Sequence, residues 1–265
     1  ETKGLWDKVQ LLLALHRYVD EFIALKVDMV VFVGTPATEY GAARAADAGL
    51  PVMFVGVSMP AAIDEIEKGW ITGASTYVEP DRILNLVRAL LPKAKRLGFA
   101  LSPDPNAQKL VDELRPLAES RDFTVDAFDV DSNADSHKAA KHFLETRPDV
   151  FLILPDTWIG RDDFVNADVF RNDMLGPAKI PTVSLVFEAF DLYPDVVAVS
   201  LGIPFETSGR MGAPIFDQLV NGKAPRQVPI AYPSKSDIRV HVQTARQTGI
   251  EVTGSLLKLA TEVAE

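Results

Sequence analysis

The chain has 265 residues, which exceeds the usual size of one hydrophobic core and fits two domains of ordinary size. Its composition, 47% hydrophobic and 24% charged, is typical of a globular protein and excludes a disordered or fibrous one. The formal net charge of -10 argues against a nucleic-acid partner, because binding to a phosphate backbone needs clustered Lys and Arg.

Helix and strand patterns alternate along the whole chain. The first helical pattern covers about 6–25, and its apolar face contains Val9, Leu12, Leu13, His16, Val19, Phe22 and Ile23. The predicted strands are 29–33, 52–57, 69–73, 96–101, 123–130, 150–154, 182–186 and 196–201. The further predicted helices are 38–48, 80–91, 106–120, 136–145, 166–175, 205–221 and 254–263. Because the strands are almost continuously apolar, the alternation predicts parallel strands covered on both faces and joined by right-handed βαβ crossovers.

Three segments of the first half recur in the second half in the same order. Residues 26–36 match residues 147–157, since both have a basic residue, a spacer, an aspartate, an apolar run and a short polar tip. Residues 50–55 match 180–185, and residues 71–73 match 199–202. Three matches in one order indicate a single α/β unit used twice. The repeat predicts two similar lobes with a cleft between them.

We therefore predict an α/β fold with two similar doubly wound parallel-sheet lobes joined by a multi-strand hinge. A break at residues 92–96 sets the first lobe at 1–95, with part of 204–265 returning to it. The second lobe is 96–203, with part of 226–265 joining it, and the lobe assignment of the C-terminal tail stays open. Such hinges permit closure around a ligand.

Candidate ligand contacts lie at the carboxyl ends of the predicted strands, where ligands bind to open parallel sheets. They are Thr35, Pro36, Ala37, Thr38, Ser58, Met59 and Ser75 in the first lobe, and Asn106, Asp156, Thr157, Trp158, Phe187 and Glu188 in the second. Amides near Ala37 and Thr38 suit a carboxylate, and Asp156 suits an amine. The alternatives are helix capping by the threonines or by Asp156, ordinary burial of the rings, and a solvated Glu188.

Signals for catalysis are weak. Residues 56–60 read Gly-Val-Ser-Met-Pro at a strand-to-helix turn, but the second glycine of a G-x-S-x-G nucleophile elbow is missing. A trio of Ser58, Asp156 and His241 is the kind that any long chain supplies by chance. His137 and His142 are five positions apart and do not share a helix face, so they make a poor metal pair. Without cysteine, a Walker loop or a dinucleotide fingerprint, we expect no enzyme, no cofactor and no metal.

Four segments together resemble a known family. They are 28–37 (a strand ending in Gly-Thr-Pro-Ala), 90–98 (Leu-Leu-Pro-Lys-Ala-Lys-Arg-Leu-Gly), 200–203 with 209–210, and 244–250 leading to 255–257. In their order and spacing the chain resembles the ABC-transporter substrate-binding proteins of the type I periplasmic-binding fold, in particular the tryptophan-binding-protein-like subgroup.

The resemblance implies a solute-binding protein of an ABC importer that captures an amino acid or an aromatic or carboxylate compound by hinge closure. It implies a membrane permease as partner, no membrane insertion of its own, and a periplasmic or extracellular location, free or lipid-anchored, with a signal peptide outside this sequence. An alternative with the same fold is the extracellular ligand-sensing domain of a signalling receptor.

The resemblance also shows a departure. Family members begin with a further strand, helix and strand before the helix at 6–25, so we expect a first lobe without these initial β-α-β elements. An upstream segment, processing or a shortened lobe would each explain it.

Overall fold

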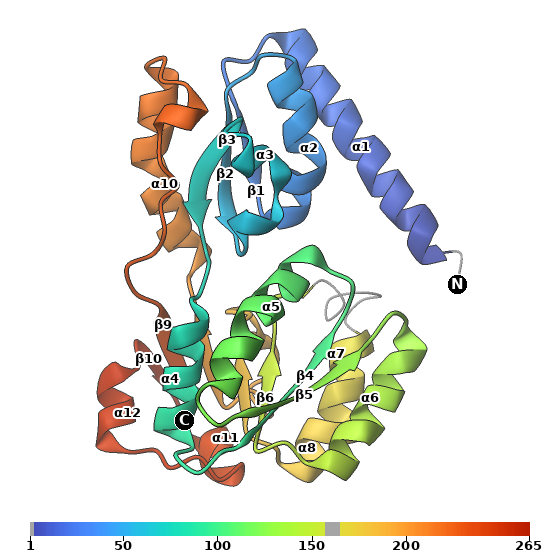
Figure 1. The fold of residues 1–265 in the computed structure, drawn as a ribbon, viewed down its shortest axis with the longest axis vertical. Helices are drawn as coiled ribbons and strands as arrows, with labels where there is room; N and C mark the ends of the chain where they lie inside the picture. The colour runs from blue at the N-terminus through green and yellow to red at the C-terminus, as the bar shows by residue number, and fades with distance from the viewer. Residues whose placement is uncertain (1–2, 157–164) are drawn as a thin grey trace. The chain divides into compact units, whose positions relative to one another are not determined.

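The computed structural model describes residues 3–156 and 165–265, and the chain forms two compact units (Figure 1). Unit 1 is Glu1–Tyr77 with Pro204–Ser234, and unit 2 is Val78–Ile203 with Lys235–Glu265. The chain passes from one unit to the other at residues 77/78, 203/204 and 234/235. The predicted fold, two α/β lobes joined by several chain segments, is confirmed.

Unit 1 contains a three-stranded parallel sheet in the order β1-β2-β3. The strands are β1 (Val30–Val33), β2 (Val52–Val57) and β3 (Ile71–Ser75). The helices are α1 (Lys3–Leu25), α2 (Thr35–Asp47), η1 (Pro60–Ala62), α3 (Asp64–Glu67), α10 (Phe205–Val220) and η4 (Pro225–Gln227).

Side chains of β2 alternate between two cores because successive residues of a strand point to opposite faces. Val52 and Phe54 belong to a core with residues of α1 and α2, whereas Met53 packs with Ile215 and Leu219 of α10. Helices thus cover both faces of β2, which explains its continuous apolar sequence.

The outer strand β1 is covered on one face only. Its burial alternates, with Val31 and Val33 exposed, because α10 packs over β2 and β3. The expectation of strands covered on both faces is therefore wrong for β1. On α1, Val19 is fully buried, but Leu13 and Phe22 of the predicted apolar face are exposed.

Unit 2 contains a seven-stranded sheet in the order β10-β9-β8-β7-β6-β4-β5, parallel except for the β8–β9 pair. The strands are β4 (Arg96–Leu101), β5 (Thr124–Asp129), β6 (Val150–Ile153), β7 (Thr182–Ser184), β8 (Val199–Gly202), β9 (Asp237–His241) and β10 (Glu262–Ala264). The helices are α4 (Pro80–Leu90), α5 (Pro105–Glu119), α6 (Asn133–Thr146), α7 (Val165–Val169), the π-helix η3 (Phe170–Leu175), α8 (Gly176–Ala178), α9 (Ala189–Leu192), α11 (Val242–Gln247) and α12 (Gly254–Leu259).

The sequence repeat reappears in the strand pairing. Strands β1, β2 and β3 correspond to β6, β7 and β8, which also lie side by side. The N–H of Val30 donates to the carbonyl of Pro51 at 3.0 Å, and the N–H of Phe151, its counterpart, donates to the carbonyl of Pro181 at 2.8 Å. The repeated residues therefore set the same register in both units.

The third strand of the repeat is shifted. Met53 pairs with Thr72, one residue before Gly73, whereas its counterpart Val183 pairs with Val199, three residues before Gly202. The shift is two residues and keeps each side chain on its face of the sheet.

Residues 78–95 belong to unit 2, whereas the predicted lobe limit was residue 95. Arg88 of α4 explains this assignment. Its guanidinium donates to the carbonyls of Ala94 at 2.9 Å and Arg121 at 3.0 Å, and it lies 4.0 Å from the centre of the Phe123 ring.

Two predicted helices differ in the structure, and strand β9 is an addition to the predicted elements. Strand β9 was not predicted, and the helix expected at 254–263 ends at Leu259, because residues 262–264 pair with β9 as the edge strand β10. The helix expected at 166–175 changes from α7 to the π-helix η3 at Phe170.

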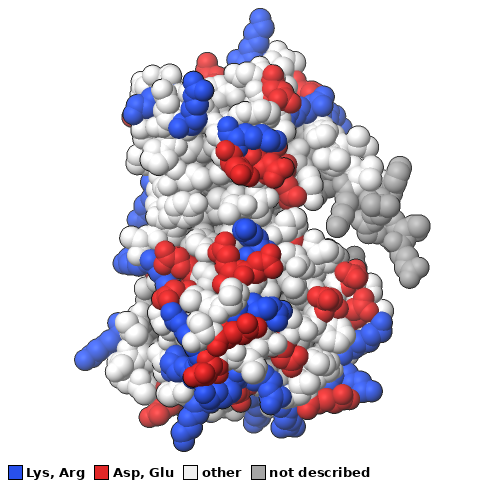
Figure 2. Space-filling view, in the orientation of Figure 1, with Lys and Arg blue, Asp and Glu red and all other residues white. Residues whose placement is uncertain are grey.

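Acidic and basic side chains are interspersed over the face shown in Figure 2. Within the described residues, no helix combines the length and the apolar character that a membrane span requires.

Candidate functional site

A β-bulge shapes the carboxyl-end edge of the sheet in unit 1. Gly56 sits where the β2–β3 register shifts, with a φ of 71°, a conformation that glycine adopts at little cost. Its N–H donates to the Oγ of Ser208 at 2.8 Å, and that hydroxyl donates to the carbonyl of Ala74 at 3.0 Å. Ser208 therefore satisfies the bulged amide and joins the start of α10 to the tips of β2 and β3.

The bulge also makes room for an aromatic ring. A Cβ added to Gly56 would lie 2.6 Å from the Cε1 of Phe205, so the ring rests against the bare glycine backbone. Phe205 is 53% exposed. Phe205 was not among the predicted contacts, because only the fold brings the first residue of α10 to the tip of β2.

The start of α2 places two predicted contacts at the same edge. Gly34, with a φ of 81°, is the N-cap, so the alternative that Thr35 or Thr38 caps this helix is wrong. Thr38 is fully buried and its hydroxyl donates to the carbonyl of Gly34 at 2.8 Å. The first intrahelical hydrogen bond runs from the Thr38 N–H to the Gly34 carbonyl. The N–H groups of Thr35 and Ala37 lie before this bond, in the first turn, where helix N–H groups have no intrahelical acceptor.

The remaining predicted contacts of unit 1 differ in exposure. Ser75 is fully buried, and its hydroxyl donates to the carbonyl of Val57 at 2.8 Å and accepts the N–H of Tyr77 at 2.9 Å. Met59 is buried, Ser58 is half-buried and Pro36 is exposed. The Ser58 side chain is therefore less buried than those of Thr35, Thr38 and Ser75.

In unit 2, a buried polar pair joins the ends of β4 and β6. Asp156 is 5% exposed and accepts the N–H of Ser102 at 2.8 Å and its hydroxyl at 2.6 Å. These strands are neighbours, so their carboxyl ends bring the two residues together. The alternative role of Asp156 as a helix cap depends on residues 157–164, which lie outside the described residues.

Asn106 lies at the start of α5, four residues after Ser102. Asp104 is the N-cap, and its Oδ1 accepts the N–H of Asn106 at 2.9 Å and the Nδ2 at 3.0 Å. Asn106 is 5% exposed. Its Oδ1 is buried and has no hydrogen-bond partner among the described residues.

The segment after β7 presents an aromatic ring held by an arginine. Arg239 of β9 is buried, and its guanidinium lies 4.8 Å from the ring centre of Phe187 and 4.1 Å from that of Phe190. It donates two hydrogen bonds to the Asp191 carboxylate, at 2.7 and 2.8 Å, which lower the pKa of Asp191. Phe187 is half-buried, and Glu188 is exposed.

Two predicted contacts, Thr157 and Trp158, lie outside the described residues. The predicted roles of all these residues in ligand binding stay predictions.

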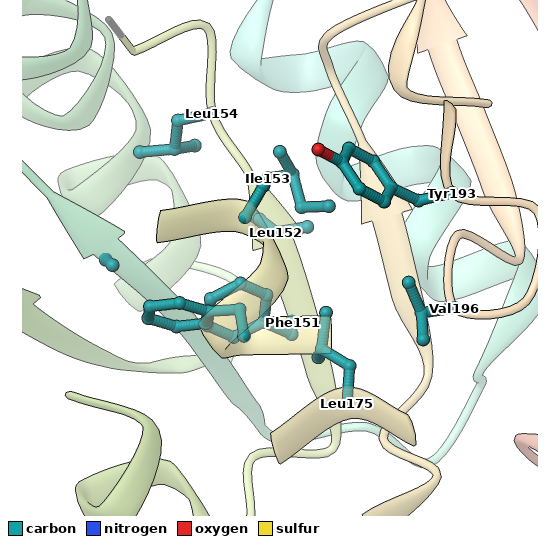
Figure 3. Close-up of a pocket in the computed structure, with 10 residues that line it drawn as sticks. Phe151, Leu152, Ile153, Leu154, Leu175, Tyr193 and Val196 are labelled. Atoms are coloured by element: carbon teal, nitrogen blue, oxygen red, sulfur yellow. The ribbon is translucent and has the colours of Figure 1, made fainter. Parts of the chain in front are cut away.

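A small cavity in unit 2 does not resemble a binding site. It lies between β6 and the η3 helix and is lined by apolar residues together with Tyr193 (Figure 3). Burial raises the pKa of the Tyr193 hydroxyl, and the Asp168 carboxylate adds to this effect. Its volume of about 20 Å³ is room for about one water molecule, whereas ligand pockets measure about 300–1,000 Å³.

The histidines have structural partners. The Nε2 of His241 donates to the carbonyl of Phe190 at 3.0 Å, and its ring stacks on that of Phe190. His137 contacts Asp173 and His142 contacts Asp126, so the two histidines face different carboxylates. Among residues 3–156 and 165–265, no group of three His, Cys, Asp or Glu side chains could hold a metal ion.

Comparison with known proteins decides the family. The model of the ABC transporter substrate binding protein family matches residues 12–264, nearly the whole chain. The chain belongs to this family.

Similar proteins include a tyrosine-binding protein of Clostridioides difficile (strain R20291), 23% identical over 232 residues. That match covers 85% of this chain, and the chain spans 64% of the length of that relative.

Two solved structures have the same fold. One is an ABC domain from Streptococcus pneumoniae in complex with L-Trp, with a TM-score of 0.78, 21% identity, and coverage of 95% of this chain and 84% of that one. The other is the ligand-free, open form of a substrate binding protein with adhesive properties from Clostridium difficile, with a TM-score of 0.70, 20% identity, and coverage of 96% and 83%. The predicted resemblance to this family and its type I periplasmic-binding fold are confirmed.

Proposed function

We propose that this substrate-binding protein captures an aromatic amino acid for an ABC importer and delivers it to a membrane permease. The observation that carries the proposal is the buried polar group at the ends of β4 and β6, formed by Ser102, Asn106 and Asp156. Small-molecule sites are mostly apolar and contain a few such polar groups, placed at the carboxyl ends of parallel strands.

Aromatic side chains accompany the polar groups in both units. Phe205 lies at the strand tips of unit 1, and Phe187 follows β7 in unit 2. A relative that binds tyrosine and a fold relative solved with L-Trp support an aromatic ligand. We include Thr35, Ala37 and Ser58 of unit 1 and Trp158 of unit 2 among the ligand contacts.

Binding is proposed to proceed by hinge closure. Three chain crossings join the units, and such hinges let a ligand that contacts both lobes favour the closed form. The protein acts in the periplasm or outside the cell, where a substrate-binding protein meets its solute. No step of this function requires bond chemistry, so the protein is proposed to act without catalysis.

A thermal-shift screen tests the proposal. Ligand at 100 times its Kd stabilises the native state by about 2.7 kcal/mol, which raises the Tm of a chain of this size by roughly 5–10 °C. We expect L-tryptophan, L-tyrosine or L-phenylalanine to give the largest shift among the twenty amino acids. No shift with any amino acid, or a larger one with a sugar, would contradict the proposal.

A further inference from the structure

The Oδ1 of Asn106 is a buried hydrogen-bond acceptor that needs a donor. The residue is 5% exposed, and its Oδ1 has no partner among the described residues. Buried polar atoms of native proteins nearly always have a partner, so an exception in a protein that binds a small molecule points to the ligand.

The orientation of the Asn106 amide is fixed by its neighbour. Its Nδ2 lies 3.0 Å from the Oδ1 of Asp104. A carboxylate only accepts hydrogen bonds, so the flipped amide would place two acceptors against each other. The atom left over is therefore the oxygen, and it calls for an N–H or O–H donor.

The charges around Asn106 favour a cationic donor. Asp104, bonded to Asn106, and Asp156, bonded to Ser102, are two buried carboxylates at the start of α5 and the neighbouring strand ends. Hydrogen bonds with a charged partner are about twice as strong as neutral ones, and an ammonium offers three N–H donors.

We propose that Asn106 accepts an N–H from the ligand's α-ammonium group, so that unit 2 holds the amino end of the amino acid. This inference rests on the proposed function, because it assigns one end of the amino-acid ligand to one residue. Ser102 and Asp156 hold the strand ends on which this subsite is built.

Matched ligands and variants test the assignment. The ligand pairs are L-tryptophan with indole-3-propionate, L-tyrosine with 3-(4-hydroxyphenyl)propionate, and L-phenylalanine with 3-phenylpropionate. Each pair differs only in the amino group. The variant is Asn106→Ala. The control is Gln108→Ala, in the same turn of α5 as Asn106, which removes a hydrogen bond from the Gln108 Nε2 to the Ser102 carbonyl. Affinities come from titration calorimetry, with competition for weak ligands, and circular dichroism checks the fold.

We expect Asn106→Ala to weaken the affinity for the amino acid roughly ten- to hundredfold and the affinity for the des-amino acid less than twofold. Gln108→Ala should change neither affinity by more than about twofold. Equal loss for both ligands would overturn the inference, since Asn106 would then shape the loop. No loss for either would also overturn it, because binding of the amino group would then not depend on Asn106.

The wild-type protein gives a test that does not depend on the folding of any variant. It should bind the amino acid at least tenfold more tightly than the des-amino acid, and equal affinities would overturn the inference. If both members of every pair fail to bind, the proposed function itself fails, an outcome distinct from binding without discrimination.

Discussion

Replacing Gly56 by alanine isolates the role of Phe205. Gly56 has a φ of 71°, and its added Cβ would lie 2.6 Å from the Cε1 and 2.8 Å from the Cδ1 of Phe205. Gly49 provides the control, because its φ is 79° and nothing lies within 4 Å of its added Cβ. Both substitutions strain the backbone, but only Gly56→Ala displaces the ring.

The left-handed conformation costs an alanine about 1–2 kcal/mol, which is the full loss of unfolding free energy expected for Gly49→Ala. Phe205 is half-exposed, so its ring moves aside at a further cost of about 0.5–1.5 kcal/mol. We therefore expect Gly56→Ala to lose about 1.5–3.5 kcal/mol in urea denaturation. In a Phe205→Ala background, the loss should fall to that of Gly49→Ala.

Ligand affinity gives the second readout. A displaced aromatic contact costs about 0.5–1.5 kcal/mol of binding free energy. Gly56→Ala should therefore weaken the affinity for an aromatic amino acid about two- to tenfold, and Gly49→Ala should leave that affinity unchanged. Equal losses of stability and affinity in the two variants would refute the role given to Phe205.

The remaining predictions concern unit 2. Ser102→Ala should lower the free energy of unfolding by about 1.5–3 kcal/mol in urea, because it removes a buried hydrogen bond to a carboxylate, whereas Ser58→Ala should change it by less than about 0.5 kcal/mol. Equal effects would contradict the structural role of the Ser102–Asp156 pair. Arg239 lowers the pKa of Asp191, so the ionised carboxylate stabilises the fold above its unfolded pKa of 3.8, and this stabilisation is lost as the pH falls through the lower folded pKa. Asp191→Asn should thus be less stable than the wild type at pH 7, by a small margin because the carboxylate is mostly exposed, and the difference should disappear in acid. A difference that persists at pH 2 would show that charge is not its cause.

Most of the sheet could be predicted because its strands carry their own signal. Strands β2, β4 and β6 are apolar runs between helical patterns, and Val30 and Phe151, which match in the repeat, make corresponding backbone hydrogen bonds. Strand β9 gave no such signal, since it contains Arg239. That arginine is buried only because Asp191 and Glu262, 48 and 23 residues away, pair with it.

The candidate site was predictable by position and not by contact. Strand ends located Asp156 and Asn106, because carboxyl ends of neighbouring parallel strands converge. Sequence could not show that Ser102 holds Asp156, nor that the Thr38 hydroxyl is turned to Gly34. These depend on distances between side chains that only the folded chain sets.

The central claim is that this chain binds an aromatic amino acid, and calorimetric titration of the wild-type protein tests it most directly. The account predicts saturable binding of L-tryptophan, L-tyrosine or L-phenylalanine at one molecule per chain, with a negative heat-capacity change from burial of the ring. Absence of binding for all three, while an amino acid without an aromatic ring saturates the protein, would contradict the claim.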